Sequence, residues 1–210
     1  MLLLNETIKY CKILIENGAD VNIKNSFGNT PLHIACASYD PRKDHSPKFE
    51  EFFLNNGAEI DSLNNELETP LMMLFFDQGQ DDRNSANNSK YDPITALVIL
   101  LKFKADVNIV SKSKKTALHY AWSKGSSISA LSLIQNGADW NAKDYTETTP
   151  YGYAMKNNHE DLCIFLIQQG KLIDLPINSA VPNPDHKLNQ IEILERYVNS
   201  PEVDELLNQK

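Results

Sequence analysis

Apolar residues recur at helical spacing in five short segments of the chain. The segments cover residues 8–15, 49–54, 96–101, 128–134 and 162–167. In each of them the apolar positions gather on one face of a helix, and a glycine or a lysine stands shortly after the last one. Glycine at such a place ends a helix in the left-handed conformation. The pattern predicts five helices that stack through their apolar faces.

A second kind of helix is predicted at a recurring threonine. The four occurrences read Thr30-Pro31-Leu32-His33, Thr69-Pro70-Leu71-Met72, Thr116-Ala117-Leu118-His119 and Thr149-Pro150-Tyr151-Gly152. Threonine caps a helix by accepting a hydrogen bond from a backbone N–H group, and proline in the first turn gives up an N–H group that the helix does not use. Each threonine stands 12 residues after a Gly-Ala or Lys-Ala pair begins. The fixed offset indicates one unit copied four times.

The stretch from Thr30 to Ala35 is a full match to the T-P-L-H-x-A signature of an ankyrin repeat. The chain resembles the ankyrin-repeat family over about residues 7–175. The resemblance implies an all-α repeat solenoid of about four to five repeats, in which helix-turn-helix pairs are linked by β-hairpin-like loops. In this family the histidine of the motif hydrogen-bonds toward a neighbouring repeat. His33 and His119 keep that histidine, whereas Met72 and Gly152 replace it.

The Gly-Ala positions set the repeat boundaries. We expect a partial first repeat (its second helix) over residues 1–17, repeats over residues 18–56, 57–103, 104–136 and 137–169, and a degenerate repeat or helical C-terminal cap over residues 170–210. Successive anchors lie 39, 47, 33 and 33 residues apart, against a regular period of about 33. The excess of 6 and of 14 residues is expected in polar loops between the two helices of a repeat, at residues 39–47 and 77–92.

Three places depart from the regular pattern. Lys104 replaces the glycine of the other repeats, so we expect a strained or differently shaped helix end there. Met1 to Leu4 are expected to be the remnant of a first helix. We favour the explanation that the array is cut from a longer one; the alternative is that a half-repeat caps this end. Residues 187–199 and 201–209 predict two helices that cover the last repeat or lead into another domain.

Composition narrows the class of function. The net charge of −8 and the isoelectric point of about 5.1 argue against nucleic-acid binding. No stretch of 18 apolar residues is present to span a membrane, and Cys11, Cys36 and Cys163 lack metal-ligand spacing. We expect reduced core thiols, no metal, no cofactor and a location in the cytoplasm or nucleus. The chain is expected to be a monomer or a subunit of a larger complex.

No catalytic constellation is evident in the sequence. His159-Glu160-Asp161 resembles an acid–base cluster but occupies the place where a repeat starts its second helix. Asp77, Asp81 and Asp82 suggest a calcium loop. An EF-hand needs glycine at the sixth position and glutamate at the twelfth, where Asp82 and Asn88 stand instead. We predict that the chain is not an enzyme.

The resemblance implies that a partner protein binds to the hairpin tips and to the concave face formed by the first helix of each repeat. The candidate residues are Ser26, Phe27, Asn29, Asn65, Glu66, Glu68, Phe76, Lys112, Ser113, Lys115, Lys124, Tyr145, Thr146 and Lys156. Phe27 and Tyr145 are aromatic residues of the kind that interfaces favour, at tips where the fold does not need them. Lys112 and Lys115 make one tip basic beside an acidic one, which favours a partner with an acidic segment next to a basic one. The alternative is that tips are simply exposed and therefore charged.

The resemblance also implies a modification. Asn22, Asn108 and Asn141 each follow a leucine by eight residues, as in ankyrin repeats that resemble substrates of an asparagine hydroxylase. The alternative is structural, because an asparagine at this place can cap the hairpin turn by bonding backbone groups.

We therefore expect a protein-protein interaction module or scaffold. Two alternatives remain open from the sequence. The chain can be a recruiting segment of a larger enzyme, such as a kinase, a ligase or an ADP-ribosyl transferase, whose catalytic domain lies outside it. It can also be a microbial effector that binds host proteins.

Overall fold

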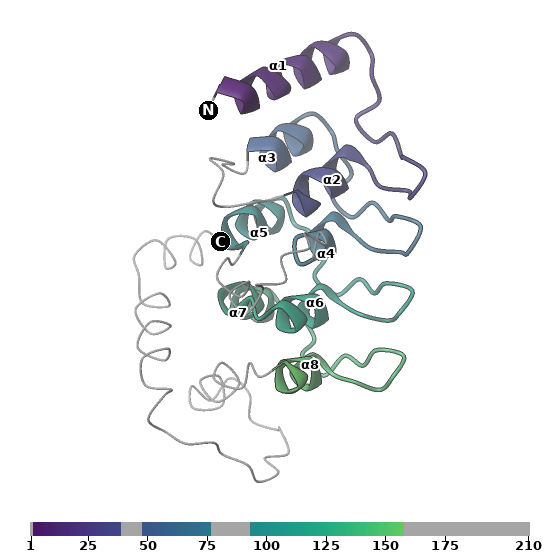
Figure 1. Cartoon of the computed structure of the whole chain (residues 1–210), viewed down its shortest axis with the longest axis vertical. Helices are drawn as coiled ribbons and strands as arrows, with labels where there is room; N and C mark the ends of the chain where they lie inside the picture. Colours follow the sequence, from purple (N-terminus) through teal and green to yellow (C-terminus); the bar gives the residue numbers. More distant parts are fainter. Residues whose placement is uncertain (1, 39–47, 77–92, 158–210) are drawn as a thin grey trace, which may run out of the picture. The chain divides into compact units, whose positions relative to one another are not determined.

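The computed structural model describes residues 2–38, 48–76 and 93–157, without the side chains of residues 2–6 and 48 (Figure 1). The chain divides into a unit from Met1 to Tyr153 and a second unit from Ala154 to Lys210. Residues 154–157, at the end of one helix, are the described part of the second unit. The predicted C-terminal cap lies outside the described residues.

The described helices alternate between two rows (Figure 1). The outer helices are α1 (Leu2–Glu16), α3 (Lys48–Asn55), α5 (Ile94–Lys102) and α7 (Ser127–Gln135), and the inner helices are α2 (Pro31–Ala37), α4 (Pro70–Met73), α6 (Ala117–Lys124) and α8 (Pro150–Lys156). Helix α2 packs on α4 and α4 on α6, while α3 packs on α5 and α5 on α7. Residues 2–38, 48–76 and 93–157 contain helices and turns and no strand, which confirms the all-α repeat solenoid. None of the helices described here is long and apolar enough to cross a membrane.

A finger precedes each inner helix and projects on the side away from the outer helices (Figure 1). We number the fingers one to four, over residues 18–29, 57–68, 104–115 and 137–148. Their tips form a ladder, because Asn65 donates its backbone N–H to the Phe27 carbonyl at 3.0 Å, Lys112 to Glu66 at 2.9 Å and Tyr145 to Ser113 at 3.1 Å. Successive fingers are therefore held in register.

The inner helices begin at the predicted threonines. Thr30 is in extended backbone at φ −81°, and its hydroxyl accepts the N–H of His33 at 3.4 Å. Thr69 makes the same contact with the N–H of Met72 at 3.3 Å. Proline follows each of these two threonines in the first turn, as expected.

The motif histidines join one repeat to the next. His33 accepts the backbone N–H of Thr30 on Nδ1 at 3.1 Å, so its proton lies on Nε2, which donates to the Glu68 carbonyl at 3.0 Å. His119 repeats the arrangement with Thr116 at 3.0 Å and the Thr148 carbonyl at 3.2 Å. Both rings are fully buried. The expected bond toward a neighbouring repeat is confirmed at both histidines.

Both insertions fall between an inner and an outer helix, as the spacing predicts. Helix α2 ends at Ala37 and α3 begins at Lys48, while α4 ends at Met73 and α5 begins at Ile94. In the regular third repeat only Gly125 and Ser126 separate α6 from α7, with Gly125 at φ 73°. The inserted residues 39–47 and 77–92 themselves lie outside the described residues.

The expectation for Met1 to Leu4 is wrong in one respect. Residues 2–4 are the first turn of α1, which runs without a break from Leu2 to Glu16. No glycine or proline separates Leu4 from Ile8, so nothing in the sequence interrupts the backbone hydrogen bonds of the helix. These residues are therefore part of an outer helix and not the remnant of an inner one.

Burial of the two motif histidines predicts a pH-dependent stability. Burial lowers the pKa of His33 and of His119 from 6.5, more than the bonds to Glu68 and Thr148 raise it. The stability that these neutral rings contribute is complete above about pH 6.5 and is lost as the pH falls toward their folded-state pKa. We expect a lower free energy of unfolding, measured with urea, at about pH 5.5 than at about pH 7.5.

A double variant, His33→Gln with His119→Gln, separates this effect from the carboxyl groups. At neutral pH its free energy of unfolding should be about 2–4 kcal/mol lower than that of the original protein. It should also lose less stability on acidification, because it lacks the two histidines while the carboxyl groups of Glu50 and Asp61 are the same in both proteins. An equal loss in both proteins would exclude the histidines as its source.

Lys104 generates a second prediction about stability. It adopts φ 69°, in the left-handed region where Gly18, Gly57 and Gly137 lie at φ 87–89°. Because a side chain strains this conformation, Lys104→Gly should raise the free energy of unfolding by about 0.5–1 kcal/mol. Gly137→Lys is the matched control and should lower it by about 1 kcal/mol, since no atom lies within 4 Å of the added Cβ and only the backbone strain remains. Equal stability of all three proteins in a urea titration would contradict the strain.

Candidate partner-binding surface

Large side chains stand exposed at two finger tips, as the sequence predicts. Phe27 is 70% exposed and Tyr145 is 68% exposed. Of the other candidates, Ser26, Asn65, Glu66, Lys112, Thr146 and Lys156 are exposed, and Asn29, Phe76, Ser113, Lys115 and Lys124 are half-buried. Such a surface leaves aromatic and charged groups available on the outer part of the fingers.

The expectation that Glu68 is an exposed tip residue is wrong. Glu68 is only 7% exposed. Its carboxylate accepts a hydrogen bond from Asn64 Nδ2 at 3.0 Å and another from the Tyr120 hydroxyl at 3.0 Å. The residue immediately precedes a motif threonine, where the finger returns to the body of the repeat. Glu68 therefore holds the second finger to the inner helix of the third repeat.

The basic and acidic fingers partly neutralise each other. Lys112 of the third finger lies 3.3 Å from the carboxylate of Glu66 on the second, and both side chains are more than half exposed. An exposed pair of this kind contributes about 0–1 kcal/mol, but it offsets the charge of both residues. Lys115 has no carboxylate partner within the described part of the chain. Its ammonium group is directed to aromatic rings instead.

These rings and Lys115 form a cluster that we call the tyrosine–lysine platform, made of Phe76, Lys115, Tyr120 and Tyr153. Lys115 Nζ lies 4.7 Å from the centre of the Tyr153 ring and 5.7 Å from that of Tyr120, within cation–π range. The rings of Phe76 and Tyr120 have centres 5.4 Å apart. Three inner helices or their ends thus contribute to one half-buried surface beside the fingers.

Tyr120 and Tyr153 were not among the residues proposed from the sequence. Each is the fourth residue after a motif threonine and is followed by alanine. This register was the signal that could have found them, because it places both rings on the same side of successive inner helices.

Hydrogen bonds fix both tyrosines in place. The Tyr120 hydroxyl donates to Glu68, and the Tyr153 hydroxyl donates to Asp144 Oδ2 at 2.7 Å. Burial and the bond to Asp144 raise the pKa of Tyr153 to about 12, and burial raises the pKa of Tyr120. Both hydroxyls are therefore protonated at any physiological pH.

Asp144 supports this end of the platform. Its carboxylate accepts the backbone N–H groups of Thr146 at 2.8 Å and Thr148 at 3.0 Å, which closes the fourth finger. Burial alone would raise the pKa of Asp144, but bonds from Thr146, Tyr153 and Thr148 outweigh it and hold the pKa well below its usual value. The group is a fixed negative charge that aligns Tyr153.

The three candidate asparagines differ in their contacts. Asn22 Nδ2 donates to the Gly57 carbonyl at 3.1 Å, and its Oδ1 accepts the Glu59 N–H at 2.8 Å. Asn108 makes the equivalent bonds to Gly137 at 2.9 Å and Asp139 at 2.8 Å. Both side chains therefore join two repeats. The amide of Asn141, which is exposed, makes no hydrogen bond to the rest of the described chain.

The structural alternative for these asparagines needs a correction. The hairpin turn is capped by the aspartate two residues earlier, because the N–H of Asn22 bonds Asp20, that of Asn108 bonds Asp106 and that of Asn141 bonds Asp139, at 2.8–2.9 Å. Aspartate at this place offers its own carboxylate two residues ahead, so the asparagine amide is left to reach the next repeat.

Within residues 2–38, 48–76 and 93–157, no three histidine, cysteine or acidic side chains gather in a way that could hold a metal ion. The two clusters weighed for chemistry in the sequence, His159-Glu160-Asp161 and the acidic residues from Asp77 to Asp82, lie outside the described residues.

Comparison with known proteins agrees with the geometry of the repeats. Ankyrin repeat models match residues 5–41 (many copies), 27–65 (a single repeat) and 85–177 (three copies). The human neurogenic locus notch homolog protein 1 is 30% identical over 139 residues, which is 66% of this chain and 5% of that protein. The human transient receptor potential cation channel subfamily A member 1 is 29% identical over 163 residues, 76% of this chain and 13% of that protein. On the evidence of its motifs, its repeated contacts and these matches, the chain belongs to the ankyrin-repeat family.

Proposed function

We propose that this protein binds an extended segment of a partner protein along the fingers and the tyrosine–lysine platform. Ankyrin repeats are a protein-interaction fold, which supports binding in general. The observation that carries the more specific proposal is the platform itself. It gathers three aromatic rings and one lysine, Lys115, on a single half-buried surface.

The rigidity of this surface supports binding without a large loss of entropy. The hydrogen-bond ladder sets the spacing of the finger tips before any partner arrives. Its bonds join Asn65 to Phe27, Lys112 to Glu66 and the fourth finger to the third. The hydroxyls of Tyr120 and Tyr153 are already hydrogen-bonded, so the rings lose little freedom when they are covered. Surfaces that are organised in advance avoid part of the cost of association.

The chemistry of the platform defines the partner. Lys115 supplies a positive charge against the flat faces of two tyrosines, in a protein whose net charge is −8. A partner carboxylate beside an apolar or aromatic side chain would match this pair, the carboxylate against the ammonium group and the apolar group against the rings. The exposed ring of Tyr145 extends the apolar contact toward the tips.

Binding is tested by capture from native extract, with crosslinking mass spectrometry to identify the partner and its contact site. We expect Lys115→Glu and Tyr145→Ala each to weaken capture of the main partner about tenfold, since an interface anchor is worth about 1–2 kcal/mol. Matched controls are Lys102→Glu and Tyr10→Ala, which alter an exposed lysine on α5 and a 60% exposed tyrosine on α1. Both should leave capture unchanged.

Crosslinks confined to the outer helices, or equal capture by all four variants, would exclude the platform as the binding surface. Unfolding midpoints of the variants, measured in parallel, show whether a loss of capture reflects a loss of folding.

We also propose hydroxylation of asparagine, with a preference that the contacts define. Asn22 and Asn108 must give up two bonds to the next repeat before an enzyme can reach them, whereas Asn141 is exposed and has no such bond in the described chain. Intact-mass and peptide measurements on protein from a eukaryotic host should show one added oxygen, first at Asn141. An unmodified mass would dismiss the modification.

A further inference from the structure

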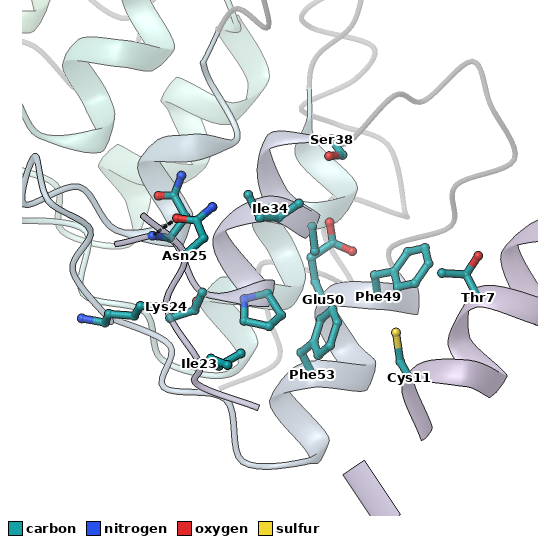
Figure 2. A pocket seen from close by; sticks show the side chains of 14 residues that line it. Thr7, Cys11, Ile23, Lys24, Asn25, Ile34, Ser38, Phe49, Glu50 and Phe53 are labelled. Atoms are coloured by element: carbon teal, nitrogen blue, oxygen red, sulfur yellow. Dashed lines mark hydrogen bonds between the residues drawn. The ribbon is translucent and has the colours of Figure 1, made fainter. Parts of the chain in front are cut away.

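A mainly apolar hollow of about 520 Å³ lies between α1 and the first complete repeat. Figure 2 shows Cys11 of α1 on one side of it, Ile23 of the first finger and Ile34 of α2 on another, and Glu50 and Phe53 of α3 between them. No residue of the tyrosine–lysine platform lines this hollow. It is therefore a separate feature of the surface.

The hollow occupies the place that an inner helix fills elsewhere in the array. Helix α2 packs on α4, and Met73 of α4 is 8% exposed. Ile34 stands at the same register of α2, four residues after its motif threonine, and is 45% exposed. Ile23 is likewise 63% exposed, whereas Ser62 at the same register of the second finger is 6% exposed. The first complete repeat thus leaves uncovered the face that the second repeat buries.

The first finger also has a backbone N–H group that the ladder of finger tips leaves without an acceptor among the described residues. Asn65, Lys112 and Tyr145 each donate an N–H group to the finger before them, and Ser26 holds the same place in the first finger. No described residue accepts a hydrogen bond from the Ser26 N–H group. The tip of the first finger therefore has one more position for a ladder bond.

A carbonyl group shows the same pattern. The carbonyls of Glu68 and Thr148 each accept a bond from the motif histidine of the preceding repeat. Asn29 holds this place in the first finger and lines the hollow. Its carbonyl accepts one bond, from the Asn25 N–H at 3.0 Å, so that one lone pair stays available within the described structure.

A carboxyl group in the wall of the hollow points to a polar contact with the occupant. Glu50 is only 2% exposed, at a register where Leu97 and Ala130 stand fully buried in α5 and α7. Burial raises the pKa of Glu50, so an occupant that carries a hydrogen-bond donor would meet a carboxyl group in the wall.

We propose that this hollow is the docking site of a further ankyrin repeat, whose finger and inner helix come from a polypeptide outside these 210 residues. The occupant's finger accepts the Ser26 N–H group, its motif histidine donates to the Asn29 carbonyl, and its apolar helix face covers Ile23 and Ile34. Each of these contacts repeats one that the following repeats already make, so the occupant would continue an interface that the array already contains.

The test adds such a repeat to the chain. A copy of residues 104–126, which comprise a finger, an inner helix with its motif histidine and the turn into the next outer helix, replaces residues 1–7. The fusion reproduces, between its threonine and Gly18, the 21-residue spacing from Thr116 to Gly137. We expect the melting temperature to rise by at least about 4 °C, and the alkylation of Cys11 by a maleimide, followed by mass spectrometry, to slow several-fold.

A variant in the hollow, Ile34→Ser, is paired with a control variant outside it, Val110→Ser. Ile34 is 45% exposed in the hollow, and Val110 is 46% exposed in the third finger, away from it. In the original chain, Ile34→Ser and Val110→Ser should change the melting temperature little, because both side chains face solvent. In the fusion, Ile34→Ser should remove most of the gain and Val110→Ser should keep it.

Two results would overturn the proposal. An unchanged melting temperature together with unchanged Cys11 labelling in the fusion would show that the face does not accept a repeat. A dimer of the original chain in sedimentation experiments that Ile34→Asp dissociates, with Cys11 protected in the dimer, would assign the face to a second copy. Neither result bears on the tyrosine–lysine platform, because the variants that test it lie in later repeats.

Discussion

Hydrogen bonds between successive repeats are the constraint on which the rest of the structure depends. An ankyrin repeat has too little apolar surface to be stable alone, so its stability comes from the interface with its neighbour. In this chain the interface combines three links: a buried motif histidine, an asparagine at the base of the finger and the ladder of finger tips. All three end on backbone groups of the next repeat. They therefore fix the register between repeats whatever side chains the surface carries.

The junction between the second and third repeats lacks one of these links and keeps only half of another. Met72 replaces the motif histidine, and Asp61 replaces the asparagine, so that a carboxylate accepts the Asp106 N–H at 3.1 Å and no amide donates in return. Burial and the neighbouring Asp106 raise the pKa of Asp61. Other contacts join the two repeats instead, because Tyr120 bonds Glu68 and packs on Phe76, and Lys112 pairs with Glu66. The Phe76–Tyr120 part of the platform thus stands where the regular motif is lost, and these two residues serve both stability and the proposed binding.

Sequence reasoning reached the fold and the exposed tips but not the platform. Helix starts at Thr30 and Thr69 and the exposure of Phe27 and Tyr145 depend on local chemistry and on repeat register, which the sequence displays. Glu68 was misplaced because its burial depends on Tyr120, which is 52 residues away. The neutralisation of Lys112 by Glu66 depends in the same way on the approach of two fingers.

By itself, the sequence determined the all-α repeat architecture, the places of both insertions and the fixed row of fingers, because each follows from caps, helix-ending residues and a constant spacing of 12 residues. Tertiary structure alone decided which side chains the fingers leave available. The open face beside α1 is of the same kind. It is defined by what packs on the repeats and not by any residue that the repeats contain.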